Sequence, residues 1–404
     1  MLADKEFGML TINGIPIGPI FGGTQPVRQE GMLTSGDLVT VTSDGIDLNA
    51  LWNSFAESIS IYNEAMDDLI ELLTYPVTTP IEPVVQIGEL TFEEASEIGV
   101  PRGAGLPIEV FQMGYDLRHY DKRNVFTWMF LADADARQVE AIHEAVLWAD
   151  KRLVFRKILE ALFDNRTRRA NIRTQAYSVY PLYNGDGVAP PRFKNNTFDE
   201  SHNHYMISSN STLDSSDLDD LLEQITEHGY SPQAGTMFLL LANKAETDVI
   251  RTFRRGVVNN NGATAAYDFI PSPTQPAMIL PNAEGLLGNQ PAPLFGNLPV
   301  IGSYGFWHIV EEEYIPSGYL LGVGFGGRFN LANPVGLRQH ANPAMQGLRI
   351  LPGNYQRYPI IDGFYARSFG TGIRQRGGAA IMQVKASGTY DIPTQYKKGG
   401  GFLV

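Results

Sequence analysis

The longest uninterrupted helical pattern in the chain lies between Asp135 and Asn165. Asp135 is a good N-cap residue, and Gln138, three residues further on, can complete a capping box. Apolar side chains then recur at steps of three and four residues along one face, at Val139, Ile142, Val146, Ala149 and Leu153. After Leu153 the apolar positions spread to other faces, and neither Pro nor Gly interrupts the pattern. At about 1.5 Å per residue such a helix is roughly 45 Å long, so it is either the core helix of a large domain or a spine that joins separate lobes.

A second helical pattern precedes this one along the chain. Asp47 can cap a helix over residues 48–74, and Pro76 indicates where that helix ends. Its apolar stripe comprises Leu51, Phe55, Ile59, Tyr62, Met66, Leu69 and Leu73. Residues 1–46 are rich in Gly, Thr and Pro and contain only short apolar runs. Such a segment cannot offset its own ordering entropy, so we expect an extended arm that becomes ordered only in an assembly.

The hydrophobic pattern changes its period between the two helices. Phe111, Met113, Tyr115 and Leu117 alternate with polar or small residues, which predicts a half-buried strand. The upstream run VVQIGEL (84–90) can pair with a strand of this region across a Gly/Pro-rich tip at 98–105, and 125–130 is a further candidate strand. We therefore predict a long hairpin that nothing local covers on both faces and that docks on another surface.

A second lobe is predicted from about Leu213 onward. In the run SSDLDDLLEQITEHG, Ser216 and Asp219 resemble a capping box, and Gly229 marks the end of a short helix. The run TMFLLLA (236–242) is continuously apolar and predicts a fully buried strand, after which Asn243 can cap another helix. Further strands are predicted at 298–303, 318–324 and 379–384. The last of these has to return to a sheet formed earlier in the chain, so we predict an α+β fold whose first lobe is discontinuous.

Composition sets limits on the class of protein. The chain has 404 residues, of which 43% are hydrophobic and 19% charged, as in soluble globular proteins with more than one lobe. No apolar run approaches the ~18 residues of a membrane span, and we expect neither a signal peptide nor contact with a membrane. The chain contains no cysteine, which excludes disulfides and cysteine metal sites.

The charge of the chain is strongly acidic and uneven. The formal net charge is −13, which argues against a protein that holds nucleic acid tightly. Residues 1–80 carry a large excess of acids, whereas residues 364–398 are net basic. This polarity indicates either pairing between segments or subunits, or two faces that are solvated separately.

One motif resembles a nucleotide-binding loop. GVGFGG at 322–327 matches G-x-G-x-x-G and follows a strand-like run. A dinucleotide site also needs a helix directly after the loop and an acidic residue about twenty positions further on. Pro334 blocks that helix, and the next acidic residue is Asp362. We therefore predict no cofactor.

The histidines are the other candidates for chemistry. His202 and His204 could place two imidazoles on one side of a strand, as a metal would require, but they lie in a polar run without a third ligand nearby. We interpret them as solvated loop residues, and we place His143 on the surface because it lies off the apolar stripe of its helix. No spacing selects a catalytic triad, a P-loop or HExxH. The sequence predicts no catalytic and no metal site, and hence a protein that is not an enzyme.

The order of these patterns resembles one known family. An acidic arm, a long hairpin, a spine helix, an inserted α+β lobe and a returning basic strand occur in this order in the major capsid proteins of tailed bacteriophages, which have the Hong Kong ninety-seven fold. Local runs agree. TMFLLLANKAETDVIRTFRRG looks like the strand, turn and helix of the family's axial domain, and GIRQRGGAAIMQVKASGTY resembles its terminal strand pair.

The resemblance implies a domain organisation for nearly the whole chain. Residues 1–76 are similar to the N-terminal arm and its helix, and residues 77–131 to the extended loop. Residues 132–212 correspond to the peripheral domain with the spine helix, residues 213–360 to the axial domain, and residues 361–404 to the return to the peripheral domain and the C-terminal tail. The tip of the extended loop, at Pro101, Arg102 and Gly103, is the expected assembly interface.

The function implied by the resemblance is structural. Such a chain self-assembles into pentamers and hexamers of an icosahedral shell around double-stranded DNA, in the cytoplasm of a bacterial host. Expected partners are the chain itself, scaffolding, portal and decoration proteins, and packaged DNA by weak non-specific contact. Some members of the family join subunits by an isopeptide bond from a lysine of the extended loop. Here Lys122 is the only lysine in 77–131 and lies at the base of the hairpin, so we expect a noncovalent shell.

Two other classes of protein fit the same patterns. An encapsulin-like nanocompartment shell shares the fold, and a monomeric α+β enzyme or binding module shares the composition. The size of the purified protein separates a monomer from a shell.

Overall fold

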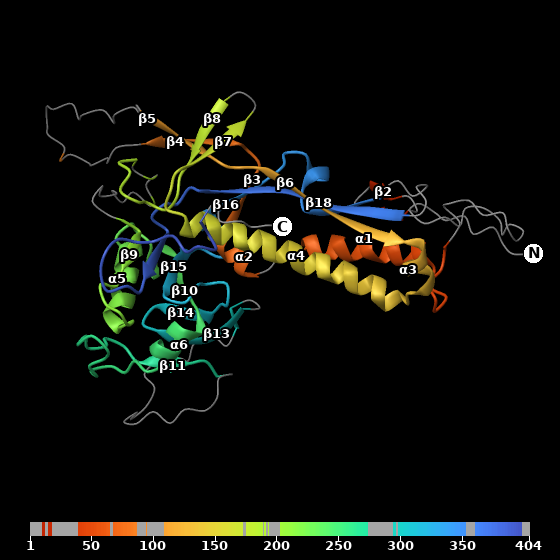
Figure 1. Cartoon of the computed structure of the whole chain (residues 1–404). Helices are drawn as coiled ribbons and strands as arrows, with labels where there is room; N and C mark the ends of the chain where they lie inside the picture. The colour runs from red at the N-terminus through yellow and green to blue at the C-terminus, as the bar shows by residue number, and fades with distance from the viewer. Residues whose placement is uncertain are drawn as a thin grey trace, which may run out of the picture. The chain divides into compact units, whose positions relative to one another are not determined.

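The computed structural model describes residues 10–12, 15–17, 39–64, 68–86, 94, 109–172, 175–188, 190, 193, 203–273, 294–295, 298–352 and 360–397 (Figure 1). The chain folds into two compact units. The first unit comprises Met1–Asp67, Leu117–Phe155 and Gln339–Phe369, and the second comprises Asp68–Asp116, Arg156–Arg338 and Gly370–Val404.

Two helices form one layer of the first unit. They are α1 (Leu48–Glu64) and the first part of α4 (Ala136–Phe163). Both predicted N-caps are confirmed. Asp47 Oδ1 accepts from the backbone N–H of Asn49 at 2.7 Å. Asp135 Oδ1 accepts from Gln138 N at 2.9 Å, while Asp135 N donates to Gln138 Oε1 at 3.2 Å, which completes the capping box.

The helix expected over 48–74 is described as two helices. α1 ends at Glu64, and α2 (Asp68–Leu73) belongs to the second unit, while residues 65–67 lie outside the described residues. Pro76 does not simply stop a helix, because it lies inside strand β3 (Thr74–Val77).

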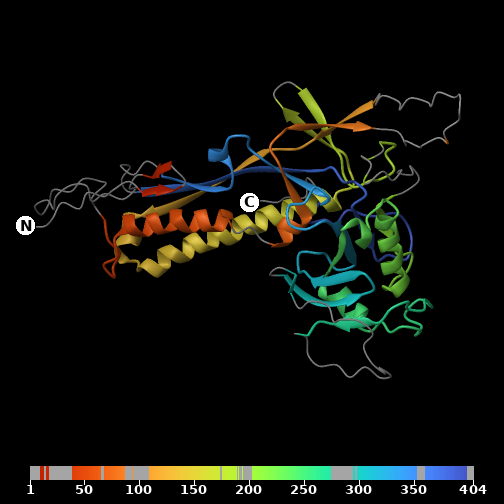
Figure 2. The ribbon, with the colours of Figure 1, turned by 180° about the vertical axis from the view of Figure 1, so that it is seen from behind.

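A sheet forms the other layer of the first unit. β18 (Ile360–Ile373) pairs antiparallel with β6 (Arg118–Thr127) on one side and with β17 (Leu348–Pro352) on the other. Figures 1 and 2 show α1 and α4 side by side along β6 and β18. The strand expected over 125–130 is wrong beyond Thr127. The Thr127 side chain accepts from Phe130 N and caps the short helix α3 (Trp128–Asp133) instead.

Apolar side chains of α1, α4 and the sheet form the core between these layers, which includes Leu51, Trp52, Phe55, Phe126, Val139 and Tyr365. One ion pair is buried with them. Arg367 Nε donates to Asp150 Oδ1 at 2.7 Å, and the Tyr62 hydroxyl donates to Asp150 Oδ2 at 2.9 Å. Burial raises the pKa of Asp150 and the Arg367 charge opposes that rise, so the carboxylate depends on its partners.

His143 is part of this core, so its expected surface position is wrong. Its side chain is buried, and its ring stacks on Phe55 with the centroids 4.3 Å apart. The Ser58 hydroxyl already donates to Phe55 O, so His143 Nε2–H donates to Ser58 Oγ at 2.7 Å and Nδ1 accepts from the Tyr365 hydroxyl at 2.8 Å. The sequence could not show this, because Ser58 and Tyr365 come from distant segments.

A sheet of 8 strands organises the second unit. Its path runs β11-β13-β14-β10-β15-β19-β9, and β12 pairs with β13. The strands are β9 (Tyr205–Ile207), β10 (Met237–Ala242), β11 (Phe269–Pro271), β12 (Leu294–Phe295), β13 (Leu298–Tyr304), β14 (Trp307–Glu311), β15 (Tyr319–Phe325) and β19 (Ala379–Gln383). The predicted buried strand is confirmed as the central β10. The last strand does return to a sheet formed earlier in the chain, but this sheet contains β15 of the predicted second lobe and not only segments of the first.

Helix α5 (Ser215–Thr226) packs on this sheet through Leu218, Leu221 and Ile225. Its capping box consists of Asp214 and Asp217, two residues before the predicted pair Ser216 and Asp219. The run DSSDLDD contains several serines and acids that could each act as the N-cap residue. Burial of the leucines decides where the helix begins and therefore which pair forms the capping box. α6 (Lys244–Ile250) follows β10, and its N-cap residue Asn243 donates to Ile315 O rather than accepting from the helix.

Two glycines of the GVGFGG run have a packing role. Gly322 and Gly324 lie inside β15. A Cβ on Gly322 would lie 2.6 Å from the Trp307 ring and 3.0 Å from Leu221, and a Cβ on Gly324 would lie 3.1 Å from Ile225. These positions therefore let α5 approach the sheet closely.

The remaining elements are short. In the first unit β1 (Leu10–Ile12) pairs with β2 (Ile15–Ile17), and a 3₁₀ turn spans Pro343–Met345. In the second unit β16 (Val335–Gln339) pairs in parallel with β3, and β7 (Arg168–Ile172) and β8 (Gln175–Val179) form a hairpin. A second hairpin consists of β4 (Ile81–Gln86) and β5 (Glu109–Gly114), and a 3₁₀ turn spans Pro232–Ala234.

We predict that the first unit loses stability in mild acid. Burial lowers the pKa of His143 from 6.5 to about 4. The folded unit therefore binds fewer protons than the unfolded chain between these values, so the contribution of His143 is complete above pH 6.5 and is lost as the pH falls towards 4. His143→Phe keeps the stacked ring but leaves Ser58 and Tyr365 without their partner. It should cost on the order of 1–3 kcal/mol at neutral pH and remove this pH dependence.

Hydrogen exchange of the α1 and α4 amides measures both the cost of the substitution and the pH dependence. Samples are incubated at several pH values and then labelled at a single pH. His119→Gln, which changes an exposed histidine of β6, serves as the control. Equal protection of α1 near pH 7 and near pH 4.5 in the unmodified chain would contradict the prediction.

Candidate assembly site at the base of the extended hairpin

The β4–β5 hairpin of the second unit carries the segment in which the sequence places the expected assembly interface. Its strands pair antiparallel from Ile81 opposite Gly114 to Gln86 opposite Glu109, with Val84 opposite Phe111. This confirms the predicted pairing of the run that begins at Val84. The expected interface at Pro101, Arg102 and Gly103 lies outside the described residues, so it stays a prediction.

A buried hydrogen-bond chain holds the base of the hairpin. Tyr75 of β3 and Tyr115, which directly follows β5, have their hydroxyl oxygens 2.8 Å apart, and both residues are at most 1% exposed. The Tyr115 hydroxyl donates to Glu82 Oε2 at 2.6 Å, so Tyr75 donates to Tyr115. Arg374 Nη1 lies 3.1 Å from Glu82 Oε1. Burial raises the pKa of both tyrosines, so they remain protonated donors, and the chain ends on a carboxylate that an arginine neutralises.

Two glycines make room for the Tyr115 ring. A Cβ on Gly336 would lie 2.4 Å from this ring, and a Cβ on Gly372 would lie 2.6 Å from it. The backbone of Tyr115 is held as well, because its N–H donates to Pro80 O at 3.0 Å and its C=O accepts from Arg338 Nη1 at 2.8 Å. Ring and backbone together fix the direction in which β5 leaves the unit.

The neighbouring β7–β8 hairpin covers the same base. A Cβ on Gly114 would lie 2.7 Å from Ser178 O, and Met113 and Val84 are buried. The expectation that nothing local covers both faces of the hairpin stays a prediction, but at its base the β7–β8 hairpin does contact β5. No sequence pattern predicts this contact or the hydrogen-bond chain from Tyr75 to Arg374, since the partners come from four separate segments.

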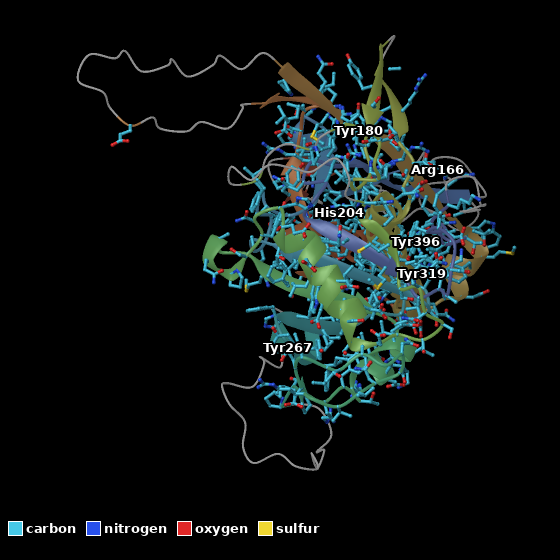
Figure 3. All side chains as sticks on the ribbon, turned by 90° about the vertical axis from the view of Figure 1, so that its left-hand side faces the viewer. Arg166, Tyr180, His204, Tyr267, Tyr319 and Tyr396 are labelled. Carbon is cyan, nitrogen blue, oxygen red and sulfur yellow. The ribbon has the colours of Figure 1, made fainter. Side chains whose placement is uncertain are left out.

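The second unit also corrects the interpretation of His204. This residue is fully buried rather than solvated. Its Nδ1 lies 2.8 Å from Ala379 O and its Nε2 lies 3.0 Å from His228 Nε2, and Figure 3 shows it where α5 meets the strands of the sheet. His202 lies outside the described residues. Within the part of the chain that the structure describes, no three His, Asp or Glu side chains are arranged to hold a metal ion, and no helix is long and apolar enough to cross a bilayer.

Comparison with known proteins gives one close relative. No model of a known protein family matches the chain, and no curated protein matches it. Among solved structures, a chain of Mycobacterium phage Patience is 84% identical, with a TM-score of 0.71, over 94% of this chain and 100% of that chain.

Other matches are distant. A chain of the mature capsid of bacteriophage PhiM1 is 10% identical over 80% of this chain and 89% of that chain, with a TM-score of 0.49. A chain of the holo-SrpI encapsulin complex from Synechococcus elongatus PCC 7942 is 13% identical over 80% and 89% of the two chains, with a TM-score of 0.42. Neither adds to the argument. The identity with the phage chain, over nearly the full length of both, decides the family. The chain belongs to the major capsid proteins of tailed bacteriophages, which have the Hong Kong ninety-seven fold.

Proposed function

We propose that this capsid protein forms its shell from closed rings of five and six copies, which enclose double-stranded DNA. A capsid protein has to reuse one set of interfaces many times, and closed rotational symmetry allows this without open filaments. The observation that carries the proposal is the β4–β5 hairpin, whose buried base fixes its direction while residues 87–108 connect its two strands.

We assign the domains by the same family resemblance. Residues 1–76 are the arm and its helix, residues 77–131 the extended loop, and residues 213–360 the axial domain. The peripheral domain comprises residues 132–212 and the returning segment from residue 361 onward, although its strands β9 and β19 continue the sheet of the axial domain. Long-range contact between subunits then falls on the arm and the extended loop, which spreads a large interface over several neighbours.

The expected partners follow from this role. The protein acts as a structural protein of the virion, and we propose that it assembles in the cytoplasm of the bacterial host with scaffolding, portal and decoration proteins. The net charge of −13 suits weak contact with packaged DNA, because repulsion keeps the DNA mobile.

The tip of the extended loop should be needed for assembly and not for folding. Deletion of Ile98–Gly105 removes residues between the paired strands and leaves the buried base intact. We expect a soluble, folded subunit that forms no shells, as measured by sedimentation and electron microscopy. Deletion of Pro281–Gly288, an equally long Pro/Gly-containing stretch of another segment, is the matched control and should still give shells. Normal shells from the first deletion would exclude the tip as an essential contact.

The hydrogen-bond chain at the hairpin base should control how well the hairpin is held. Tyr115→Phe keeps the ring in its glycine-lined position but removes the hydroxyl that is the hydrogen-bond partner of both Tyr75 and Glu82. A buried polar group left without its partner costs about 1–3 kcal/mol, so exchange of the β4 and β5 amides should rise roughly tenfold and the yield of shells should fall. Tyr267→Phe, at a residue that is 42% exposed, is the control. Unchanged exchange in both strands would show that packing alone holds the base.

The shell should be held together without covalent bonds between subunits. Lys122, the only lysine in 77–131, lies in β6 opposite Tyr365 and far in sequence from the tip. Arg102 stays protonated and cannot act as an amine nucleophile, although it can pair bidentately with a carboxylate of a neighbour. Mature particles boiled in detergent should therefore run as one band near 44.6 kDa. A ladder of multiples, with Lys122 in a crosslinked peptide, would refute this.

A further inference from the structure

Two histidines of the second unit face each other inside the protein. His204 is 0% exposed and His228 is 5% exposed. Their Nε2 atoms are 3.0 Å apart, and the ring centroids are 5.0 Å apart. His204 directly precedes β9, whereas His228 follows the last turn of α5. The pair therefore joins the end of a helix to the edge of a sheet.

The contacts define which nitrogens carry protons. Ala379 O can only accept, so His204 Nδ1 carries a hydrogen and donates across 2.8 Å. In the neutral ring Nε2 of His204 is then an acceptor. The facing Nε2 of His228 has to donate, so His228 carries its hydrogen on Nε2. Each ring is thus restricted to one tautomer.

The two rings differ in how firmly they are held. The backbone of His204 donates to Tyr183 O at 2.8 Å and accepts from Ile381 N at 2.8 Å, which fixes it between two strands of chain. His228 N donates to Ile225 O at 3.3 Å, and the next residue, Gly229, has φ 89°. The end of α5 is therefore the side that can move when the pair separates.

The described neighbours of the pair include one arginine and two buried tyrosines. The Arg376 guanidinium lies over the ring of Tyr183, 5.2 Å from its centroid, and the backbone O of Tyr183 accepts from His204 N. Tyr205 of β9 and Tyr230 beyond α5 are buried, which raises the pKa of both, so they stay neutral. Glu227 is the acidic neighbour of His228 along the chain, and Asp186 is occupied by Arg376 at 2.7 Å.

We infer that His204 and His228 form an acid-sensitive latch between α5 and the edge strand β9 with its neighbour β19. The neutral pair is closed by one N–H···N hydrogen bond. A first proton can add to Nδ1 of His228 without breaking this bond, because Nε2–H of His228 still donates to Nε2 of His204. A second proton places N–H against N–H and two like charges about 3 Å apart in the interior, which drives the rings apart. Once the rings separate and reach solvent, they can titrate near the ordinary value of about pH 6.5, so acid below this pH favours the open form and releases the end of α5 from the sheet.

Hydrogen exchange on the full-length protein, in the assembled form in which it is purified, tests the latch. Samples are incubated between about pH 7.5 and pH 4.5 and then pulse-labelled at a single pH. Peptides that cover the end of α5, β9 and β19 should take up label at least about tenfold faster after acid incubation. Peptides of β10, β13 and β14 should change much less.

Two variants separate the latch from other effects of acid. His228→Gln supplies an amide that can donate to or accept from His204 and does not titrate, so its acid response in these peptides should be lost. His340→Gln changes a half-buried histidine of the first unit, and its response should match the unmodified protein. An unmodified protein whose α5 end stays equally protected at every pH would overturn the inference, as would an acid response retained in His228→Gln. The pH series of hydrogen exchange on the unmodified protein tests the inference even if a variant does not fold.

Discussion

Burial of the Tyr115 hydroxyl is the constraint on which the base of the extended hairpin depends. A phenol in the interior has to find both a donor and an acceptor, since an unmade hydrogen bond there costs about 1–3 kcal/mol. Tyr75 and Glu82 meet this requirement only when β3 and β4 lie next to the end of β5. Glu82 in turn needs Arg374, which follows β18 directly. One hydroxyl therefore ties together four segments that are distant in sequence, and substitution of any of them disturbs the others.

Other buried polar groups act in the same way within each unit. In the first unit Asp150 binds both Arg367 and Tyr62. In the second unit Arg376 is 0% exposed, donates to Pro181 O and Val188 O, and pairs with Asp186. Removal of one partner of such a pair is costly because the other charge stays buried. These groups specify which loops lie together more than they add net stability.

The sequence predicted what depends on short-range pattern and missed what depends on distant partners. The helical period and the caps predict α1 and α4, and an unbroken apolar run predicts β10. In each case burial determines which neighbouring positions along the chain are apolar. Sequence pattern alone places His143 and His204 at the surface, since an imidazole in the interior differs from an exposed one only through partners such as Tyr365 and Ala379. The strand expected beyond Thr127 became helix α3 because a cap outweighed the apolar run. The base network could not be predicted, and the tip at Pro101–Gly103 stays a prediction.

The position of β19 in the sheet has a consequence for synthesis. Among the described strands, β9 has only β19 as a neighbour, and β19 also covers the outer edge of β15. β19 comes from the last part of the chain, at Ala379–Gln383. A ribosome must therefore complete almost the whole polypeptide before this sheet can close. Until then β15 exposes an unpaired edge, which invites pairing with other chains, so a nascent subunit has to be shielded or finished quickly. Products of translation that stop before β19 cannot complete this sheet.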